Sequence, residues 1–194
     1  MRLLAIETSE LVGSVAALDG GNVLAEHDLP RDQGSAQSLA PALKGLLHEV
    51  GWRPDQLELV AVTIGPGSFT GLRVGVTTAK VLAYSARAEV LGIDTLEAVA
   101  AGCPPEIDYL AVAMDAQRGQ VVAGTFRRDH EGWLASSGPW QLADLEPWLA
   151  ALPPGIALAG PVLARVSQAL PHGVCQVDPQ YWSPKASSVG RVAA

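Results

Sequence analysis

The chain has 194 residues, of which 48% are hydrophobic and 17% charged, and its formal net charge is −7. This is enough chain for one ordinary domain or two small lobes, and it excludes intrinsic disorder, which needs low hydrophobicity and high charge. With 13 Lys and Arg against 20 Asp and Glu, the chain lacks the basic face that neutralises a nucleic-acid backbone, so we expect poor nucleic-acid binding by the chain alone.

The distribution of apolar residues and cysteines points to the cytoplasm. The longest nearly uncharged stretch, residues 57–72, is broken by the turn at 65–67, so we expect no membrane-spanning helix. Too few apolar residues follow Arg2 for the apolar region of a secretory signal. Cys103 and Cys175 are isolated from each other in the sequence, which predicts reduced thiols.

The first half of the chain predicts an alternation of strands and helices. Asp-Gly-Gly-Asn at 19–22 joins two strand-like segments and predicts an antiparallel hairpin. Leucines at helical spacing predict a helix over Ser38–Val50, with Ser38 as its cap and Pro41 in its first turn. The other elements expected here are strands at 3–6, 13–18, 23–29, 59–64 and 90–93 and helices at 70–86 and 96–101.

The second half repeats the sequence plan of the first. Each half opens with an apolar strand, an acidic residue, a polar loop, a glycine and an alternating strand, which indicates an internal repeat. The Gly-Cys-Pro-Pro sequence at 102–105 predicts the boundary, giving lobes at 1–103 and 104–194 in a layered α/β fold. The later elements expected are strands at 110–114, 120–127, 156–158 and 174–177, helices at 144–152 and 163–170, and a helical piece after Pro184.

A glycine-rich loop lies between the strand at 59–64 and the helix that follows it. It lacks the lysine of a phosphate-binding P-loop and the third glycine of a dinucleotide fingerprint. We therefore predict a tight strand-to-helix turn with Ser68 or Thr70 as N-cap, the alternative being anion binding at the helix N-terminus. The residues of this motif are Gly65, Pro66, Gly67, Ser68, Phe69, Thr70, Gly71 and Arg73.

Two carboxylates follow apolar strands at equivalent places in the two halves. Glu7 with Thr8 and Ser9, and Asp115 in the second half, are the candidates for cofactor contact, because a carboxylate there could hold hydrated magnesium. Capping and turn hydrogen bonds are the favoured interpretation, since Glu10 adds a second negative charge beside Glu7. The histidines have no metal-ligand spacing, so we expect no metal site and no cofactor.

The two long helices of the first half carry more apolar and small surface than one buried face needs. A partner interface is one interpretation, because small residues allow close helix approach; packing of both stripes on the chain's own sheet is the other. The residues concerned are Leu39, Leu43, Leu46, Leu47 and Val50 on the first helix and Gly71, Gly75, Ala79 and Ala83 on the second.

The opening segment Leu4–Ser9 and, above all, the motif from Gly65 to Gly75 resemble the bacterial TsaB (YeaZ) family. The resemblance implies a duplicated actin-like, RNase H-like (ASKHA) fold with mixed sheets flanked by helices. It also implies a subunit with no catalytic residues of its own, acting in tRNA threonylcarbamoyladenosine synthesis at adenosine 37 of tRNAs that read codons starting with A. Its catalytic relative TsaD carries a histidine metal motif on its first helix, where this chain has only His48.

The partners implied by the resemblance are TsaD, in a heterodimer, and the small ATPase TsaE, with tRNA bound only through the complex. A homodimer is expected when TsaD is absent. Two other hypotheses stay open from the sequence. One is an independent ATP-binding enzyme of the actin-like or sugar-kinase superfamily, and the other is a self-contained homodimeric interaction module.

Overall fold

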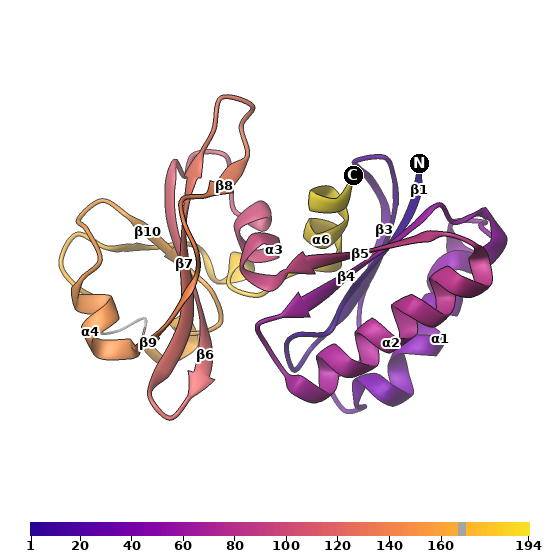
Figure 1. Cartoon of the computed structure of the whole chain (residues 1–194), viewed down its shortest axis with the longest axis horizontal. Helices are drawn as coiled ribbons and strands as arrows, with labels where there is room; N and C mark the ends of the chain where they lie inside the picture. Colours follow the sequence, from indigo (N-terminus) through magenta and orange to yellow (C-terminus); the bar gives the residue numbers. More distant parts are fainter. Residues whose placement is uncertain (167–169) are drawn as a thin grey trace. The chain divides into compact units, whose positions relative to one another are not determined.

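A computed structural model describes residues 1–166 and 170–194 of the chain. The chain forms two compact units, one made of 1–98 with 184–194 and the other of 99–183 (Figure 1). Within the described residues, no helix combines the length and the hydrophobicity needed to cross a bilayer. The predicted lobes at 1–103 and 104–194 differ from these two observed units mainly at the C-terminal segment 184–194, which belongs to the first unit.

The first unit is a five-stranded mixed sheet in the order β3-β2-β1-β4-β5. The first three strands are antiparallel neighbours, while β4 and β5 run parallel to β1 because helices connect them. The expected hairpin at 19–22 is confirmed. The strands are β1 (Arg2–Glu7), β2 (Ser14–Asp19), β3 (Asn22–Asp28), β4 (Leu59–Gly65) and β5 (Glu89–Asp94).

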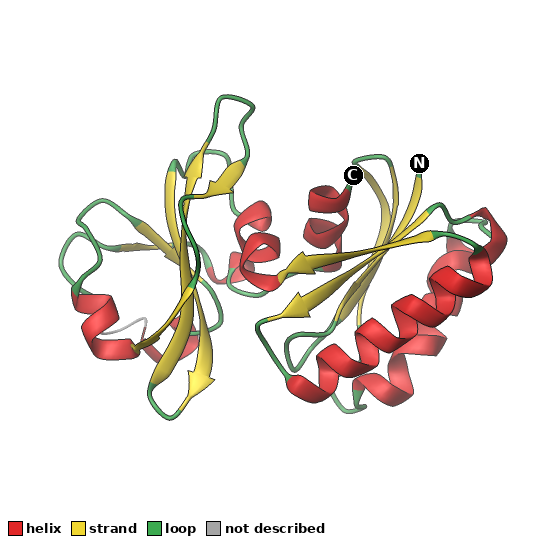
Figure 2. Cartoon of the chain, in the orientation of Figure 1, coloured by secondary structure: helices red, strands yellow, loops and turns green. Residues whose placement is uncertain are grey.

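Helices cover both faces of this sheet, as Figure 2 shows. Side chains of α1 and α2 share one apolar cluster with alternate residues of β1, β2 and β4, and α6 shares another with the remaining residues of these strands. The helices are α1 (Ser35–Glu49), α2 (Phe69–Ala86) and α6 (Ala186–Ala193), with a 3-10 turn at Pro54–Gln56. Helix α3 (Thr95–Gly102) begins in this unit and ends in the second.

The predicted start of α1 was wrong. The helix begins at Ser35 with Gly34 as its N-cap, which places Pro41 inside the helix. Ser38 does not cap the helix, because its hydroxyl donates to the Gly34 carbonyl at 3.2 Å from within the first turn.

The C-terminal helix α6 is fixed on the sheet by polar contacts at its N-terminal end. The Ser187 N–H donates to one oxygen of the Glu26 carboxylate at 2.7 Å, and the Ala186 N–H donates to the Ser14 hydroxyl at 2.8 Å. Lys185 pairs with Asp28 at 2.6 Å. Strands β2 and β3 thus supply the hydrogen-bond partners that the first turn of α6 lacks, which explains why this segment belongs to the first unit.

The second unit repeats the topology of the first. Its sheet order is β11-β10-β6-β7-β8, with β9 also paired to β7, and the parallel and antiparallel pairs fall at the same places. The predicted duplicated α/β fold is confirmed; β8 and β9 were not predicted. The elements are β6 (Tyr109–Gln117), β7 (Gln120–Arg128), β8 (Leu134–Ser136), β9 (Gln141–Asp144), β10 (Ala157–Ala159), β11 (Cys175–Gln176), α4 (Leu145–Ala150), α5 (Leu163–Val166) and a 3-10 turn at Pro179–Tyr181.

The helix expected at 163–170 is α5 at its start, and its positions 167–169 lie outside the described residues.

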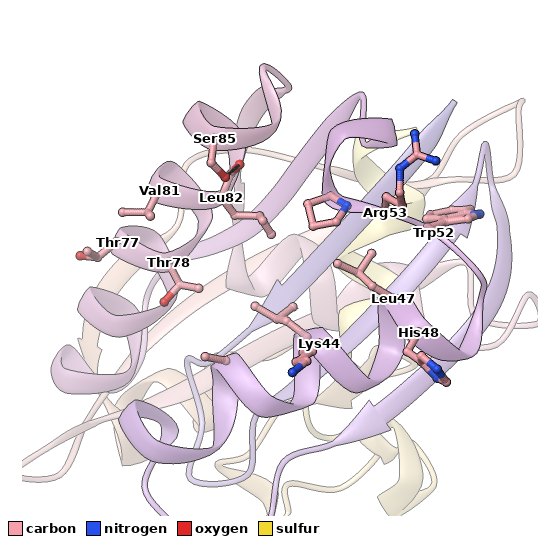
Figure 3. Close-up of a pocket in the computed structure, with 13 residues that line it drawn as sticks. Lys44, Leu47, His48, Trp52, Arg53, Thr77, Thr78, Val81, Leu82 and Ser85 are labelled. Carbon is pink, nitrogen blue, oxygen red and sulfur yellow. Dashed lines mark hydrogen bonds between the residues drawn. The ribbon is translucent and has the colours of Figure 1, made fainter.

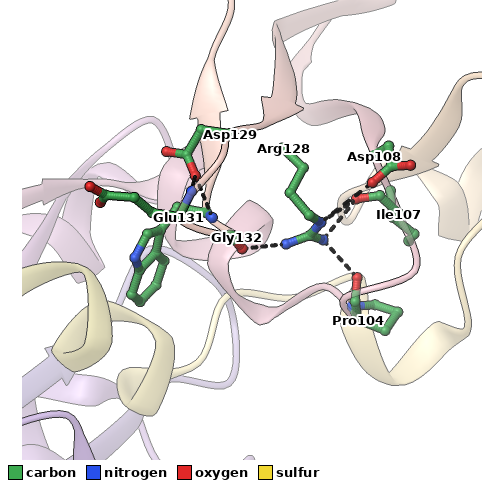
Figure 4. Close-up of polar contacts among 8 residues, drawn as sticks. Pro104, Ile107, Asp108, Arg128, Asp129, Glu131 and Gly132 are labelled. Atoms are coloured by element: carbon green, nitrogen blue, oxygen red, sulfur yellow. Dashed lines mark hydrogen bonds and ion pairs between the residues drawn. The ribbon is translucent and has the colours of Figure 1, made fainter.

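Arg128 holds the loops beside this second sheet together. Its guanidinium donates to the carbonyls of Ile107 at 2.7 Å, Pro104 at 2.9 Å and Gly132 at 2.6 Å (Figure 4). Asp108 adds a longer ion pair at 3.9 Å. Pro104 and Ile107 precede β6 in the sequence and Gly132 follows β7, so Arg128 joins the two loops that flank this hairpin and has a structural role in the unit.

Candidate functional site

The glycine-rich motif forms the tight turn between β4 and α2 that the sequence predicts. Ser68 is the N-cap, and its hydroxyl accepts a hydrogen bond from the Gly71 N–H at 3.2 Å. The Ser68 N–H in turn donates to the Ser9 carbonyl at 2.7 Å. The motif is therefore joined by a backbone hydrogen bond to the segment that follows β1.

Three glycines of this motif lie so close to residues 8 and 9 that a Cβ atom would overlap them. A Cβ added to Gly67 would lie 2.5 Å from the Ser9 carbonyl oxygen. A Cβ added to Gly71 would lie 2.0 Å from the Thr8 carbonyl oxygen, and one added to Gly75 would lie 2.2 Å from the Thr8 hydroxyl oxygen. Gly67 also has a φ of 151°, which side chains disfavour. Only glycine lets α2 approach the segment after β1 this closely.

The small-residue stripe of α2 thus packs inside the first unit. Gly71, Gly75, Ala79 and Ala83 are all buried against the chain's own sheet and loop. Leu39, Leu43, Leu46 and Leu47 of α1 are buried as well, and Val50 is half-buried. Most of these residues are used in packing the two helices on their own sheet, and a partner surface formed by them stays a prediction.

The candidate cofactor residues after β1 are closed off from solvent. The Glu7 side chain is fully buried, as are Thr8 and Ser9. One Glu7 oxygen accepts from the Ser9 N–H at 2.6 Å and from the Ser9 hydroxyl at 2.5 Å. The other Glu7 oxygen and the Thr8 hydroxyl have no hydrogen-bond partner among the residues described. The two hydrogen bonds between Glu7 and Ser9 are turn contacts of the kind that the sequence analysis favoured over cofactor binding.

Burial sets the protonation of Glu7. Removal of the carboxyl from water raises its pKa from the ordinary value of 4.5 to about 7, although the Ser9 hydrogen bonds lower it. The neighbouring Glu10 charge adds to the rise, and the Thr63 hydroxyl opposes it. Glu7 is therefore partly protonated near neutral pH.

Asp115, the second-half counterpart of Glu7, lies in a different environment. Its side chain is 39% exposed and pairs with Arg165 at 2.8 Å. It also accepts a hydrogen bond from the Gln117 N–H at 2.9 Å, at the register shift near the end of β6. The two carboxylates at equivalent positions of the repeat are thus both committed to contacts within their own units. In the described part of the chain, no group of three or more His, Cys, Asp or Glu side chains is arranged to hold a metal ion.

The open site of the first unit is an apolar groove of about 680 Å³ between α1 and α2 (Figure 3). Leu43 and Leu47 of α1 and Leu82 of α2 contribute to its walls, and Trp52 and Pro54 lie at one end. Val81, on the α2 side, is 63% exposed. A second hollow with Phe69 and Arg73 continues along the same two helices. We call these two hollows together the α1–α2 groove.

The groove explains why both helices carry excess apolar surface. The sequence identified the two helices, and Leu43 and Leu47 of its candidates do line the groove. It missed Val81, Leu82 and Trp52. The signal that could have found Val81 is its position on the outer face of α2, opposite the small-residue stripe, together with the exposed Phe69 and Tyr84.

Comparison with known proteins identifies relatives over most of the chain. The family model described as TsaD, tRNA N6-adenosine threonylcarbamoyltransferase, matches residues 29–140. The tRNA threonylcarbamoyladenosine biosynthesis protein TsaB of Bacillus subtilis is 34% identical over 152 residues, which cover 78% of this chain and 66% of the relative. The protein of the same name from Escherichia coli is 35% identical over 135 residues, covering 68% of this chain and 58% of the relative.

Solved structures show the same fold. YeaZ from Pseudomonas aeruginosa superposes with a TM-score of 0.82 at 27% identity, covering 97% of this chain and 88% of that one. The ethanolamine utilization protein EutJ from Carboxydothermus hydrogenoformans superposes with a TM-score of 0.57 at 11% identity, which shows likeness of fold alone. The predicted actin-like architecture is confirmed. The matched region spans about three fifths to two thirds of the length of the two curated relatives.

Gly→Ala changes in the two long helices should have opposite effects on stability, because Gly75 lies against Thr8 and Gly45 has open space around it. Gly75→Ala should lower the free energy of unfolding by about 1–3 kcal/mol, because overpacking against Thr8 outweighs the better helix propensity of Ala. Gly45→Ala on α1, where nothing lies within 4 Å of the added Cβ, should raise it by up to about 1 kcal/mol. Urea unfolding of both variants measures the difference.

Adding Thr8→Ala to Gly75→Ala should recover part of the loss, since it removes the hydroxyl that the new Cβ meets. Equal stability of Gly75→Ala and the wild type would contradict the close packing of α2.

The raised pKa of Glu7 predicts that the free energy of unfolding falls as pH rises from 4.5 through 7. Its pKa in the folded chain, about 7, lies above the ordinary 4.5, so its favourable contribution is complete below pH 4.5 and is lost as pH rises towards 7. The full loss corresponds to ~3 kcal/mol. Urea unfolding of the wild type at pH 5 and pH 8 should show much of this fall, and Glu7→Gln should remove it.

Glu106→Gln is the matched control, because Glu106 is exposed in the second unit. A wild-type profile that runs parallel to that of Glu7→Gln across this pH range would show that Glu7 ionises freely in the folded chain.

Proposed function

Because the chain belongs to the TsaB (YeaZ) family, within the wider group that the TsaD family model describes, we propose that it acts in the synthesis of N6-threonylcarbamoyladenosine in tRNA. Both curated relatives described above are named as biosynthesis proteins for this nucleoside. The chain would work in the cytoplasm as a subunit that activates the transferase TsaD, together with TsaE, on adenosine 37 of tRNAs that read codons starting with A.

The α1–α2 groove is the observation that supports a partner-binding role. It presents apolar walls from α1 and α2. Val81 and Phe69 of α2 line its two hollows and are each more than half exposed. Grooves of this kind accept an apolar face of another helix. A related lobe of TsaD could supply two such helices, and a second copy of this chain would use the same groove more weakly when TsaD is absent.

The buried state of the segment after β1 supports assigning the chemistry to the partner. Glu7, Thr8 and Ser9 would have to leave their packed positions under α2 before a polyphosphate could reach them. An independent ATP-binding activity is for this reason the less favoured alternative. The net charge of −7 supports tRNA contact through the other subunits of the complex.

Reconstitution tests this function directly. The chain alone should not modify tRNA, and its addition to TsaD, TsaE and a supply of threonylcarbamoyl adenylate should restore modification. The measurement is incorporation of labelled threonine into tRNA. Modification by the chain in a preparation free of TsaD would overturn the proposal, as would full activity of TsaD and TsaE without it.

Substitution in the groove tests the surface. Val81→Asp places a charge among the apolar residues of the groove and should weaken binding to TsaD by about tenfold to a hundredfold or more, with circular dichroism unchanged. Leu142→Asp is the matched control, because Leu142 is 60% exposed in the second unit. Equal affinities of the two variants, measured by calorimetry, would show that TsaD docks elsewhere.

A further inference from the structure

The α1–α2 groove has a charge opposite to that of the whole chain. Lys44 on α1, Arg53 after the end of α1 and Arg73 on α2 are among its lining residues, whereas neither of its two hollows is lined by an Asp or Glu. The whole chain, in contrast, has an excess of seven acidic residues. The apolar walls of the groove are thus bordered by cations, as Lys44 and Arg53 in Figure 3 illustrate.

Two of these cations have no carboxylate partner within the described part of the chain. Lys44 is exposed and forms no ion pair, and the Arg73 guanidinium lies over the Phe69 ring, 5.3 Å from its centroid. Arg53 pairs with Asp55 at 3.0 Å at the edge of the groove. The groove therefore presents Lys44 and Arg73 as positive charges available to a bound surface.

Helix α1 contains one acidic residue, Glu49, and α2 contains none. Glu49, at the end of α1, contacts the His27 ring at 2.6 Å, on the side of β3. A third hollow, at the N-terminal ends of α1 and α2, contains Glu10 and Asp32 together with Arg31, so its charges are mixed. Among the described residues, the linings of the two hollows of the α1–α2 groove contain Lys44, Arg53 and Arg73 and no carboxylate, so the lining of the groove is positive without an acidic residue of its own.

We propose that the rim of the groove selects its partner by charge, favouring an apolar helical surface bordered by carboxylates over a second copy of this chain. The inference rests on the proposed function and adds to it the chemistry of the partner surface. If two copies met groove to groove about a twofold axis, each would bring its own Lys44 and Arg73 and no carboxylate from the groove lining. A partner with Asp or Glu at the corresponding places would instead complement both cations.

Charges at the rim of an interface act mainly on the rate of association and on its salt dependence, because they remain partly hydrated in the complex. The proposal therefore predicts opposite salt trends for the two complexes. Raising the salt from ~0.02 M to ~0.5 M should slow association with TsaD by about tenfold, since screening removes the attraction. The same change should strengthen self-association of the isolated chain, since screening removes the repulsion.

Charge reversal at the rim identifies the residues responsible. Lys44→Glu and Arg73→Glu should each slow association with TsaD about three- to tenfold at low salt, and the effect should disappear at high salt. Arg118→Glu makes the same charge change on an exposed turn of the second unit and should slow association less than about twofold. Stopped-flow fluorescence with purified TsaD from the same organism gives the rates, and analytical ultracentrifugation gives the self-association.

The outcomes separate this inference from the function on which it rests. Rates that respond equally to Lys44→Glu and Arg118→Glu, or parallel salt trends for the two complexes, would overturn charge selection. Sensitivity of TsaD binding to Val81→Asp at high salt would in that case still support docking in the groove. If TsaD does not bind the wild-type chain at any salt concentration, the proposed function fails, and this inference fails with it.

Discussion

The close approach of α2 to the segment after β1 is the contact on which the rest of the first unit depends. Gly67, Gly71 and Gly75 bring the helix backbone against Thr8 and Ser9, and a Cβ at any of the three would overlap an atom there. The hydrogen bond from the Ser68 N–H to the Ser9 carbonyl fixes the register of this contact. The position of α2 in turn fixes the width of the groove that it forms with α1, so the inner packing determines the outer surface.

The same contact leaves a buried carboxyl at the end of β1. Glu7 is paired in register with Ser14 of β2, whose hydroxyl caps the first turn of α6. The protonation of Glu7, the position of the Thr8–Ser9 segment and the docking of α6 therefore all involve the same end of the sheet. This end of the sheet is filled by the chain's own buried side chains Glu7, Thr8 and Ser9.

Helix α2 has two faces with different chemistry. Its inner face consists of small residues and packs on the chain's own sheet, while its outer face carries Phe69, Arg73 and Val81. The buried positions of α2 are all Gly or Ala, which lets the helix backbone lie close to the segment after β1. The glycine motif thus sets the position of α2, one wall of the groove. Of its residues, Phe69, Thr70 and Arg73 line the second hollow, and none lines the first.

The sequence by itself determined the fold class, the duplication and the family. Strand periodicity, the hairpin turn at 19–22 and the glycine motif are local signals, and each depends on residues close together in the chain. The sequence also identified the two helices that border the groove. It did not predict β8 and β9, which are short and have no marked alternation, nor the return of α6 to the first sheet, which depends on contacts of Ser187 and Ala186 with residues more than 150 positions away.

Only the tertiary structure decided which face of each helix is buried. The stripe of Gly71, Gly75, Ala79 and Ala83 would allow close approach equally well to a partner helix or to the chain's own loop, so its composition cannot distinguish the two. The distinction depends on where residues 8 and 9 lie after the sheet has formed, more than 60 positions from the stripe in the sequence. Periodicity shows that a helix has a buried face, but the neighbour that covers the face is set by long-range packing.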